Sequence, residues 1–257
     1  MIKTTIMTRK YVVACSLMLI VCVLTKMFGY TNPAGLKKGF LPVVESAKKI
    51  SKSVFYKELS FANEFMPVGD KRIEKKMKKA LKANSFSNLQ TLRLHQRAEV
   101  WFPVIVPILK RYGIPEDFKY IPLIESGMER GQYSPKGAAG LWQIMPQTGR
   151  DYGLKVNTDI DERLNARLAT VAAAKYIKDL YKQFDSWILV AAAYNGGEGR
   201  LRRVINNQNQ DNYFKMDLNR ETGKYVYSLI SMKEIIEHPE DYGYKIKNPR
   251  KLMAYQN

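Results

Sequence analysis

Apolar residues recur at helical spacing along most of this chain, and no set of alternating apolar and polar segments is present that could build a sheet core. In residues 70–83, for example, Ile73, Met77 and Leu81 lie four residues apart and share one face of a helix. Similar patterns predict further helices over residues 43–66, 87–112, 115–126, 161–184 and 187–195. We therefore expect a mainly α fold without internal repeats.

Prolines mark expected irregularities in two of these helices. Pro103 and Pro107 interrupt the pattern over residues 87–112, because proline removes a backbone donor from a helix interior. Pro115 suits the first position of the next helix, and we expect that helix to kink at Pro122.

The last two predicted helices carry clear end signals. Asp161-Glu162 is expected to open the first of them, since acidic residues favour the positive end of the helix dipole. Its apolar stripe starts at Leu168. The second helix is expected to be buried and to stop at Gly196-Gly197.

The first thirty residues resemble an export signal. Three basic residues, Lys3, Arg9 and Lys10, precede an uncharged run over residues 11–25. Fifteen helical residues cover about 22 Å, short of the roughly 30 Å hydrocarbon core, but an extension to Tyr30 spans it. We favour a retained membrane anchor over a cleaved signal peptide.

The positive flank predicts that the N-terminus stays in the cytoplasm and the remainder lies outside, in the cell envelope or periplasm of a bacterium. A third alternative is a lipoprotein, because Val12 to Cys15 resembles a lipid-attachment motif. In each case the body of the chain is exported.

Charge and cysteine content limit the partners. The chain holds 42 Lys and Arg against 24 Asp and Glu, a formal net charge of +18, of which residues 1–100 carry 19 − 6 = +13. Such basicity suits nucleic acid, anionic lipid or an anionic envelope polymer, and export excludes nucleic acid. Because Cys15 and Cys22 lie in the apolar run and only two His exist, we expect no metal site and no cofactor.

The Lys-rich segment at residues 70–83 leaves two interpretations open. It is either the solvated face of a packed helix or a surface that binds an anionic polymer.

Glu125 is the strongest candidate for chemistry. It follows an apolar run over residues 118–124, so we expect its carboxyl group to be desolvated. Desolvation raises the pKa of a carboxyl group and keeps it protonated near neutral pH, as a general acid requires. The alternative is an exposed residue at a helix end.

Two further motifs carry side chains that suit a sugar ligand. In the Gly/Ala-rich turn over residues 135–146, Trp142 is either a platform for a sugar ring or a core residue, and Gln143 offers an amide. Tyr194 and Asn195 end an apolar helix beside two glycines, where Asn195 either holds the turn or binds ligand.

Four motifs in this order, Glu125-Ser126, Gly140 to Gln143, Ala193 to Asn195 and Glu221 to Val226, resemble those of the lytic transglycosylase (SLT domain) family. The resemblance implies a lysozyme-like catalytic domain with an N-terminal helical extension. It also implies cleavage of the β-1,4 bond between N-acetylmuramic acid and N-acetylglucosamine in peptidoglycan, which leaves a 1,6-anhydromuramic acid end.

The resemblance also implies roles for single residues. Glu125 is the single acid and base, in agreement with a sequence that presents no obvious second acid paired with it. Tyr194 corresponds to the tyrosine that orients this acid. The substrate-binding residues that the resemblance implies are Ser126, Ser134, Gln143, Met145, Tyr194, Asn195, Glu221 and Tyr225.

One alternative role stays open, and one segment departs from the family pattern. Glu221 and Tyr225 lie four apart on one face of a presumed helix, but an exposed structural role for Glu221 stays open. Met128, Glu129 and Arg130 stand where many relatives carry an aromatic residue, Asn and Pro, which bears on the shape of the cleft.

The expected organisation has five parts. They are an anchor or signal over 1–30, a basic linker and helical region over 31–60, a pre-catalytic helical region over 61–110, the catalytic domain over 111–246 and a tail over 247–257.

The expected partners are peptidoglycan glycan strands and, through the N-terminal segment, a membrane. The competing functions are a hydrolytic muramidase on the same fold and a non-catalytic peptidoglycan-binding scaffold.

Overall fold

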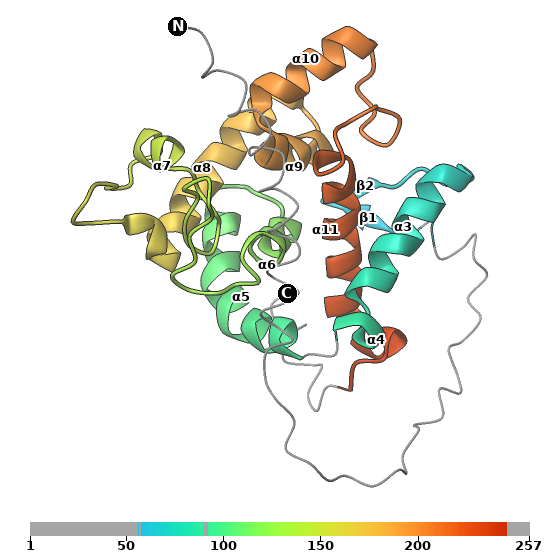
Figure 1. Cartoon of the computed structure of the whole chain (residues 1–257), viewed down its shortest axis with the longest axis horizontal. Coiled ribbons are helices and arrows are strands. Elements are labelled where there is room, and N and C mark those ends of the chain that lie inside the picture. The colour runs from blue at the N-terminus through green and yellow to red at the C-terminus, as the bar shows by residue number, and fades with distance from the viewer. Residues whose placement is uncertain (1–55, 57, 90–91, 246–257) are drawn as a thin grey trace, which may run out of the picture. The chain divides into compact units, whose positions relative to one another are not determined.

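The computed structural model of the chain describes residues 56, 58–89 and 92–245 (Figure 1). The predicted anchor over 1–30, most of the linker and the tail over 247–257 lie outside them. The helices are α3 (Lys71–Asn84), α4 (Phe86–Leu89), α5 (Arg93–Arg111), α6 (Ile121–Glu125), α7 (Pro146–Asp151), α8 (Ala166–Phe184), α9 (Trp187–Gly196), α10 (Glu198–Gln208) and α11 (Thr222–Glu237). Short 3-10 turns are η1 (Glu116–Tyr120), η2 (Glu162–Leu164) and η3 (Pro239–Tyr242). The predicted mainly α class is confirmed.

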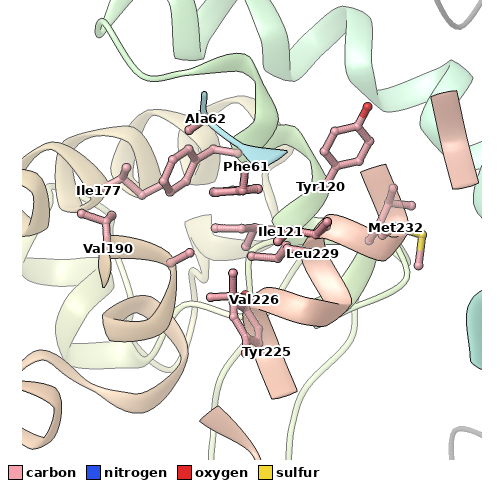
Figure 2. Packing of buried hydrophobic residues seen from close by; sticks show 14 of the residues in the cluster. Phe61, Ala62, Tyr120, Ile121, Ile177, Val190, Tyr225, Val226, Leu229 and Met232 are labelled. Carbon is pink, nitrogen blue, oxygen red and sulfur yellow. The ribbon is translucent and has the colours of Figure 1, made fainter. Parts of the chain in front are cut away.

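The helices pack around α9 and α11. Helix α11 lies against α3 on one side and against α9 and α6 on the other, while α8 packs on both α5 and α9. Figure 2 shows side chains from β1, α6, α8, α9 and α11 meeting in this core, namely Phe61, Ile121, Ile177, Val190 and Val226. Helix α9 is buried over residues 188–193, as expected from its continuous apolar run.

The prediction of a helix over residues 43–66 is wrong for its last part, residues 60–65. Residues 43–55 lie outside the described chain, and the segment after them forms an antiparallel hairpin of β1 (Ser60–Phe61) and β2 (Glu64–Phe65). Ala62 and Asn63 between the strands have φ values of 52° and 64°, a left-handed pair that reverses the chain. Phe61 is fully buried, so its packing fixes the hairpin on the helices.

Helix α5 continues through both of its prolines. Pro103 and Pro107 lie inside the 19-residue helix and do not interrupt it. Buried side chains on both sides of them, such as Phe102, Ile105 and Leu109, pack in the core. Their burial outweighs the roughly 3 kcal/mol by which an interior proline disfavours a helix.

Two predicted helix starts are also corrected. The segment expected to form one helix kinked at Pro122 is η1 followed by α6, and Pro122 lies in the first turn of α6, where its missing donor is not needed. Helix α8 begins after Asn165, whose Oδ1 accepts from the amides of Arg167 and Leu168 at 3.1 and 3.2 Å. The side chain of Leu168, placed on the apolar stripe, is 40% exposed.

A polar network fixes η1, and with it α6, against α11. The Asp117 carboxylate accepts from the amide of Ala62 at 2.7 Å and from Nζ of Lys233 at 2.6 Å. The hydroxyl of Tyr120 donates to Glu237 at 2.8 Å. Because these bonds are partly buried, they hold the two helices that carry the candidate site in one arrangement.

Within the described residues, no helix has the length and apolar character needed to cross a membrane.

Candidate active site

Glu125 lies at the C-terminal end of α6, immediately before a sharp change of chain direction. Gly127 and Met128 have φ values of 59° and 55°, and the amide of Met128 donates back to the carbonyl of Pro122 at 3.0 Å. Two consecutive left-handed residues end the helix, so the side chain of Glu125 is presented at its last turn. Met128, one of the residues that departs from the family pattern, is buried.

The carboxyl group of Glu125 is held by Tyr225 of α11. The Tyr225 hydroxyl donates to Oε1 of Glu125 at 2.6 Å, a length typical of a bond to a charged acceptor. Burial raises the pKa of Glu125 to about 7, the Tyr225 bond acts in the opposite direction, and the charge of Glu221 raises the pKa further. The prediction of a desolvated carboxyl group is therefore supported.

Glu221, predicted as a substrate-binding residue, is a second carboxyl group of this site, and its charge acts on Glu125. It lies at the N-terminal end of α11, one turn before Tyr225, and it is exposed. The Nδ2 of Asn195 donates to its Oε1 at 3.3 Å. The Oδ1 of Asn195 is buried and has no hydrogen-bond partner among the described residues.

Ser126 links the acid to the neighbouring loop. Its side chain is buried, and its hydroxyl lies 2.8 Å from the carbonyl oxygen of Leu141 and 3.1 Å from that of Pro122. A hydroxyl group with one proton is thus occupied by two carbonyl acceptors. The structure places Ser126 as a residue that fixes the loop beside Glu125.

The loop over residues 132–146 folds on itself beside Glu125. Ala139 pairs in antiparallel fashion with both Tyr133 and Ile144. At Gly140 the φ value is 74°, and an added Cβ atom would lie 2.0 Å from the carbonyl oxygen of Arg163. Only glycine can occupy this position without displacing the backbone.

Trp142 is a core residue. Its side chain is fully buried, and its Nε1 donates to Oγ1 of Thr170 at 2.9 Å. The alternative of a platform for a sugar ring is therefore wrong, because no ring face is open to a ligand.

Tyr194 supports the same loop. Its hydroxyl donates to the carbonyl oxygen of Trp142 at 2.8 Å. The family resemblance implies that Tyr194 orients Glu125; in the structure the hydrogen bond to the carboxyl group comes from Tyr225. The charge of Glu125 nevertheless raises the pKa of Tyr194, after burial, so the two groups are neighbours.

The other predicted substrate residues lie on the loop. Gln143 has a φ value of 47°, and its Nε2 donates to the carbonyl oxygens of Gly140 at 2.8 Å and Gln132 at 3.3 Å. The Oγ of Ser134 accepts from the amide of Ala138 at 2.9 Å. Met145, directly before α7, is 43% exposed.

Arg163 is a residue of the site that sequence reasoning missed. It is buried, it forms a two-pronged pair with Asp161 at 2.8 and 2.6 Å, and its Nη1 donates to the carbonyl oxygens of Gly137 at 2.7 Å and Ile144 at 2.9 Å. Arginine is rarely buried unless it is paired in this way. The only signal in the sequence was an acid two residues earlier, which is too common to be informative.

The described residues contain no group of three or more His, Cys, Asp or Glu side chains that could hold a metal ion.

Comparison with known proteins identifies the family of this region. The sequence model described as "Transglycosylase SLT domain" matches residues 104–216, which include Glu125 and Tyr194. The resemblance indicated by the four motifs is thereby confirmed.

Two relatives and one solved structure are similar to this chain. "Membrane-bound lytic murein transglycosylase D" of Escherichia coli (strain K12) is 33% identical over 180 residues, which cover 68% of this chain and 39% of that protein. "Putative tributyltin chloride resistance protein" of Alteromonas sp. (strain M-1) is 36% identical over 112 residues, or 43% of this chain and 54% of that protein. The complex of the 70-kDa soluble lytic transglycosylase with bulgecin A has a TM-score of 0.40 and 23% identity, covering 72% of this chain and 31% of that one. This chain thus spans about two fifths of the first relative.

Proposed function

Because residues 104–216 form a transglycosylase SLT domain, we propose that this chain cleaves the β-1,4 bond between N-acetylmuramic acid and N-acetylglucosamine in peptidoglycan without water as the nucleophile. The observation that carries the proposal is Glu125, whose carboxyl group has a pKa of about 7 and is fixed by Tyr225. At neutral pH such a group is present both as acid and as base, so it can give up one proton and accept another.

In the first step Glu125 acts as the acid. Tyr225 occupies Oε1 with its hydrogen bond, so we assign the transferred proton to Oε2. This proton passes to the glycosidic oxygen while the bond from the anomeric carbon to that oxygen breaks. The leaving sugar departs as a neutral alcohol, and positive charge develops at the anomeric centre beside the new carboxylate.

In the second step the same carboxylate acts as the base. It accepts the proton of the muramic acid C6 hydroxyl group, whose oxygen forms the new bond to the anomeric carbon. The product is a 1,6-anhydro ring, Glu125 regains its proton, and no water is consumed. One carboxyl group therefore completes the cycle.

Polar groups around Glu125 are suited to a sugar ligand. We assign substrate binding to Asn195, whose buried Oδ1 lacks a donor among the described residues, as an acceptor for an acetamido N–H or hydroxyl group. We assign the same role to Ser134, Gln143 and the exposed Met145 on the loop. Tyr194 and Ser126 contribute by holding that loop.

A hydrolytic muramidase is the second candidate, and Glu221 is the observation that favours it. An inverting glycosidase needs a second carboxylate to activate water, and the charge of Glu221 already acts on Glu125. In the transglycosylase mechanism Glu221 has no proton to move. Its role there is to raise the pKa of Glu125 and to hold Asn195.

Two matched variants separate these candidates. Glu125→Gln keeps the shape of the side chain but removes the acid, so we expect the rate of release of soluble fragments from purified peptidoglycan to fall by at least about a hundredfold. For Glu221→Gln we expect less than about a tenfold loss, because no proton passes through this group. Equal, complete loss in both variants would instead favour hydrolysis with Glu221 as the base, and an active Glu125→Gln protein would refute both mechanisms.

We also propose that the body of the chain acts in the bacterial envelope, where its substrate lies, and that the N-terminal segment holds it to a membrane. The name of the first relative, "membrane-bound", and the apolar run over residues 11–25 support this. Release of the protein from membranes by detergent but not by high salt is the expected result, and recovery in the soluble fraction would refute it.

A further inference from the structure

Three cations gather on the surface next to the site. Lys79 comes from α3, and Arg220 and Lys224 flank the beginning of α11; all three are exposed. Arg220 and Lys79 both lie close enough to Lys224 for their charges to lower its pKa. We call Lys79, Arg220 and Lys224 the basic cluster.

The basic cluster has no anionic partner in the described chain. None of the ion pairs found within residues 58–89 and 92–245 includes any of its members. The pKa of Lys224 lies below its ordinary value, first because the side chain is partly desolvated and then because of the charges of Arg220 and Lys79. An anion bound here would relieve this repulsion.

The cluster lies on the side of α11 that leads to the acid. Successive residues of a helix are turned by about 100°, which places Lys224 about 60° from Glu221 and about 100° from Tyr225, with Glu221 between them. Tyr225 in turn contacts Glu125. A ligand that reaches from Glu125 across Glu221 therefore meets Lys224 next, and then Lys79 of α3, which packs along α11 (Figure 1).

We propose that the basic cluster binds carboxylates of the peptide part of peptidoglycan while the glycan lies at Glu125. This inference rests on the proposed function. Every peptide chain with a free end carries a carboxylate there, and a lysine or arginine side chain binds a carboxylate through charge-assisted hydrogen bonds. The cluster thus selects glycan that bears peptides over bare glycan.

The position of the cluster favours this ligand over a lipid surface. A membrane needs a face that is free of the bulky substrate, whereas Lys224 lies within one helical turn of Glu221. A peptide attached to the bound glycan brings its carboxylates to this distance from the acid, and no second docking event is required.

The test measures binding, so that it does not depend on catalysis. In a chain that carries Glu125→Gln, affinity is compared for insoluble peptidoglycan and for the same material after an amidase has removed its peptides. We expect Lys79→Gln, Arg220→Gln and Lys224→Gln together to weaken binding to intact peptidoglycan about tenfold, equivalent to about 1.4 kcal/mol. Binding to the bare glycan is expected to stay unchanged.

A matched control removes the same charge elsewhere. The exposed cations Lys110, Arg111 and Lys155 lie outside the basic cluster, and their joint replacement by Gln is expected to leave the ratio of the two affinities unchanged. Because peptide binding is electrostatic, the preference of the unaltered cluster for intact peptidoglycan is expected to shrink as salt is raised.

Three outcomes would overturn the proposal. In the first, the triple variant binds intact peptidoglycan and bare glycan equally more weakly than its parent. In the second, it binds both as tightly as its parent. In the third, it loses binding to phosphatidylglycerol vesicles while its binding to peptidoglycan is unchanged, which assigns the cluster to lipid. If the parent protein prefers intact peptidoglycan through the cluster but cuts no glycan, only the proposed function fails.

Discussion

The raised pKa of Glu125 makes a prediction about stability that is independent of activity. Burial lifts this pKa from an ordinary 4.5 to about 7, so between these pH values the folded protein holds a proton that the unfolded chain releases. The contribution of Glu125 to the free energy of unfolding is therefore complete below pH 4.5 and is lost as the pH rises through 7. A difference of about 2.5 pH units corresponds to about 3 kcal/mol.

Glu125→Gln removes this dependence, because an amide does not titrate. The free energy of unfolding is measured by urea titration of both proteins at pH 4.5 and at pH 8. We expect the value for the variant minus that for the unaltered protein to increase by about 3 kcal/mol from the lower to the higher pH. Glu240→Gln, at an exposed carboxyl group of η3, serves as control, and its difference is expected to change by less than about 0.5 kcal/mol. If the Glu125→Gln difference is the same at both pH values, the carboxyl group is not desolvated and the reasoning fails.

Three further variants test the contacts around the acid. Tyr225→Phe removes the hydrogen-bond donor that lowers the pKa of Glu125, so we expect this pKa to rise above about 7. The alkaline limb of a profile of kcat/KM against pH then moves to higher pH, and the maximal rate falls. Gly140→Ala places a Cβ atom against the backbone of Arg163, and we expect it to lower Tm several times more than the control Gly131→Ala does. Gly131 has a similar positive φ but open space around it, so equal effects of the two substitutions would contradict the clash. Arg163→Met leaves its partly buried acidic partner without a counter-charge and the carbonyl oxygens of Gly137 and Ile144 without their donor. We expect it to reduce the free energy of unfolding by about 3 to 5 kcal/mol in urea titrations, with Arg163→Lys intermediate. A loss below about 1 kcal/mol would contradict a structural role of this pair.

Local patterns predicted the acid and the helices that surround it. The apolar run before Glu125 predicted its desolvation, and the spacing of Ile73, Met77 and Leu81 predicted the buried face of α3. Both features depend on residues close together in the chain. Apolar residues spaced three or four positions apart predict which face of a helix is buried.

Contacts between distant segments were not predictable in the same way. The bond from Tyr225 to Glu125 joins residues 100 positions apart, and the motif resemblance placed this role on Tyr194. Both tyrosines are near the acid, and only the packing of α9 and α11 decides which hydroxyl reaches it. The influence of Glu221 on Glu125 was hidden for the same reason.

Tertiary packing also overrode several local signals. Pro103 and Pro107 remain inside α5 because the residues around them are buried, and Trp142 lies in the core because Thr170 supplies a partner for its indole N–H. Arg163 carried no informative signal, since a buried arginine differs from an exposed one only through its partners. The loop geometry at the site follows from such contacts.

The most direct measurement for the central claim is the mass of the fragments that the protein releases from purified peptidoglycan. If Glu125 is both acid and base, the muramic acid ends carry 1,6-anhydro rings and are about 18 Da lighter than the reducing ends that water would leave, and Glu125→Gln releases neither. Reducing ends from the unaltered protein would contradict the account, because they require water as the nucleophile and a second group to activate it.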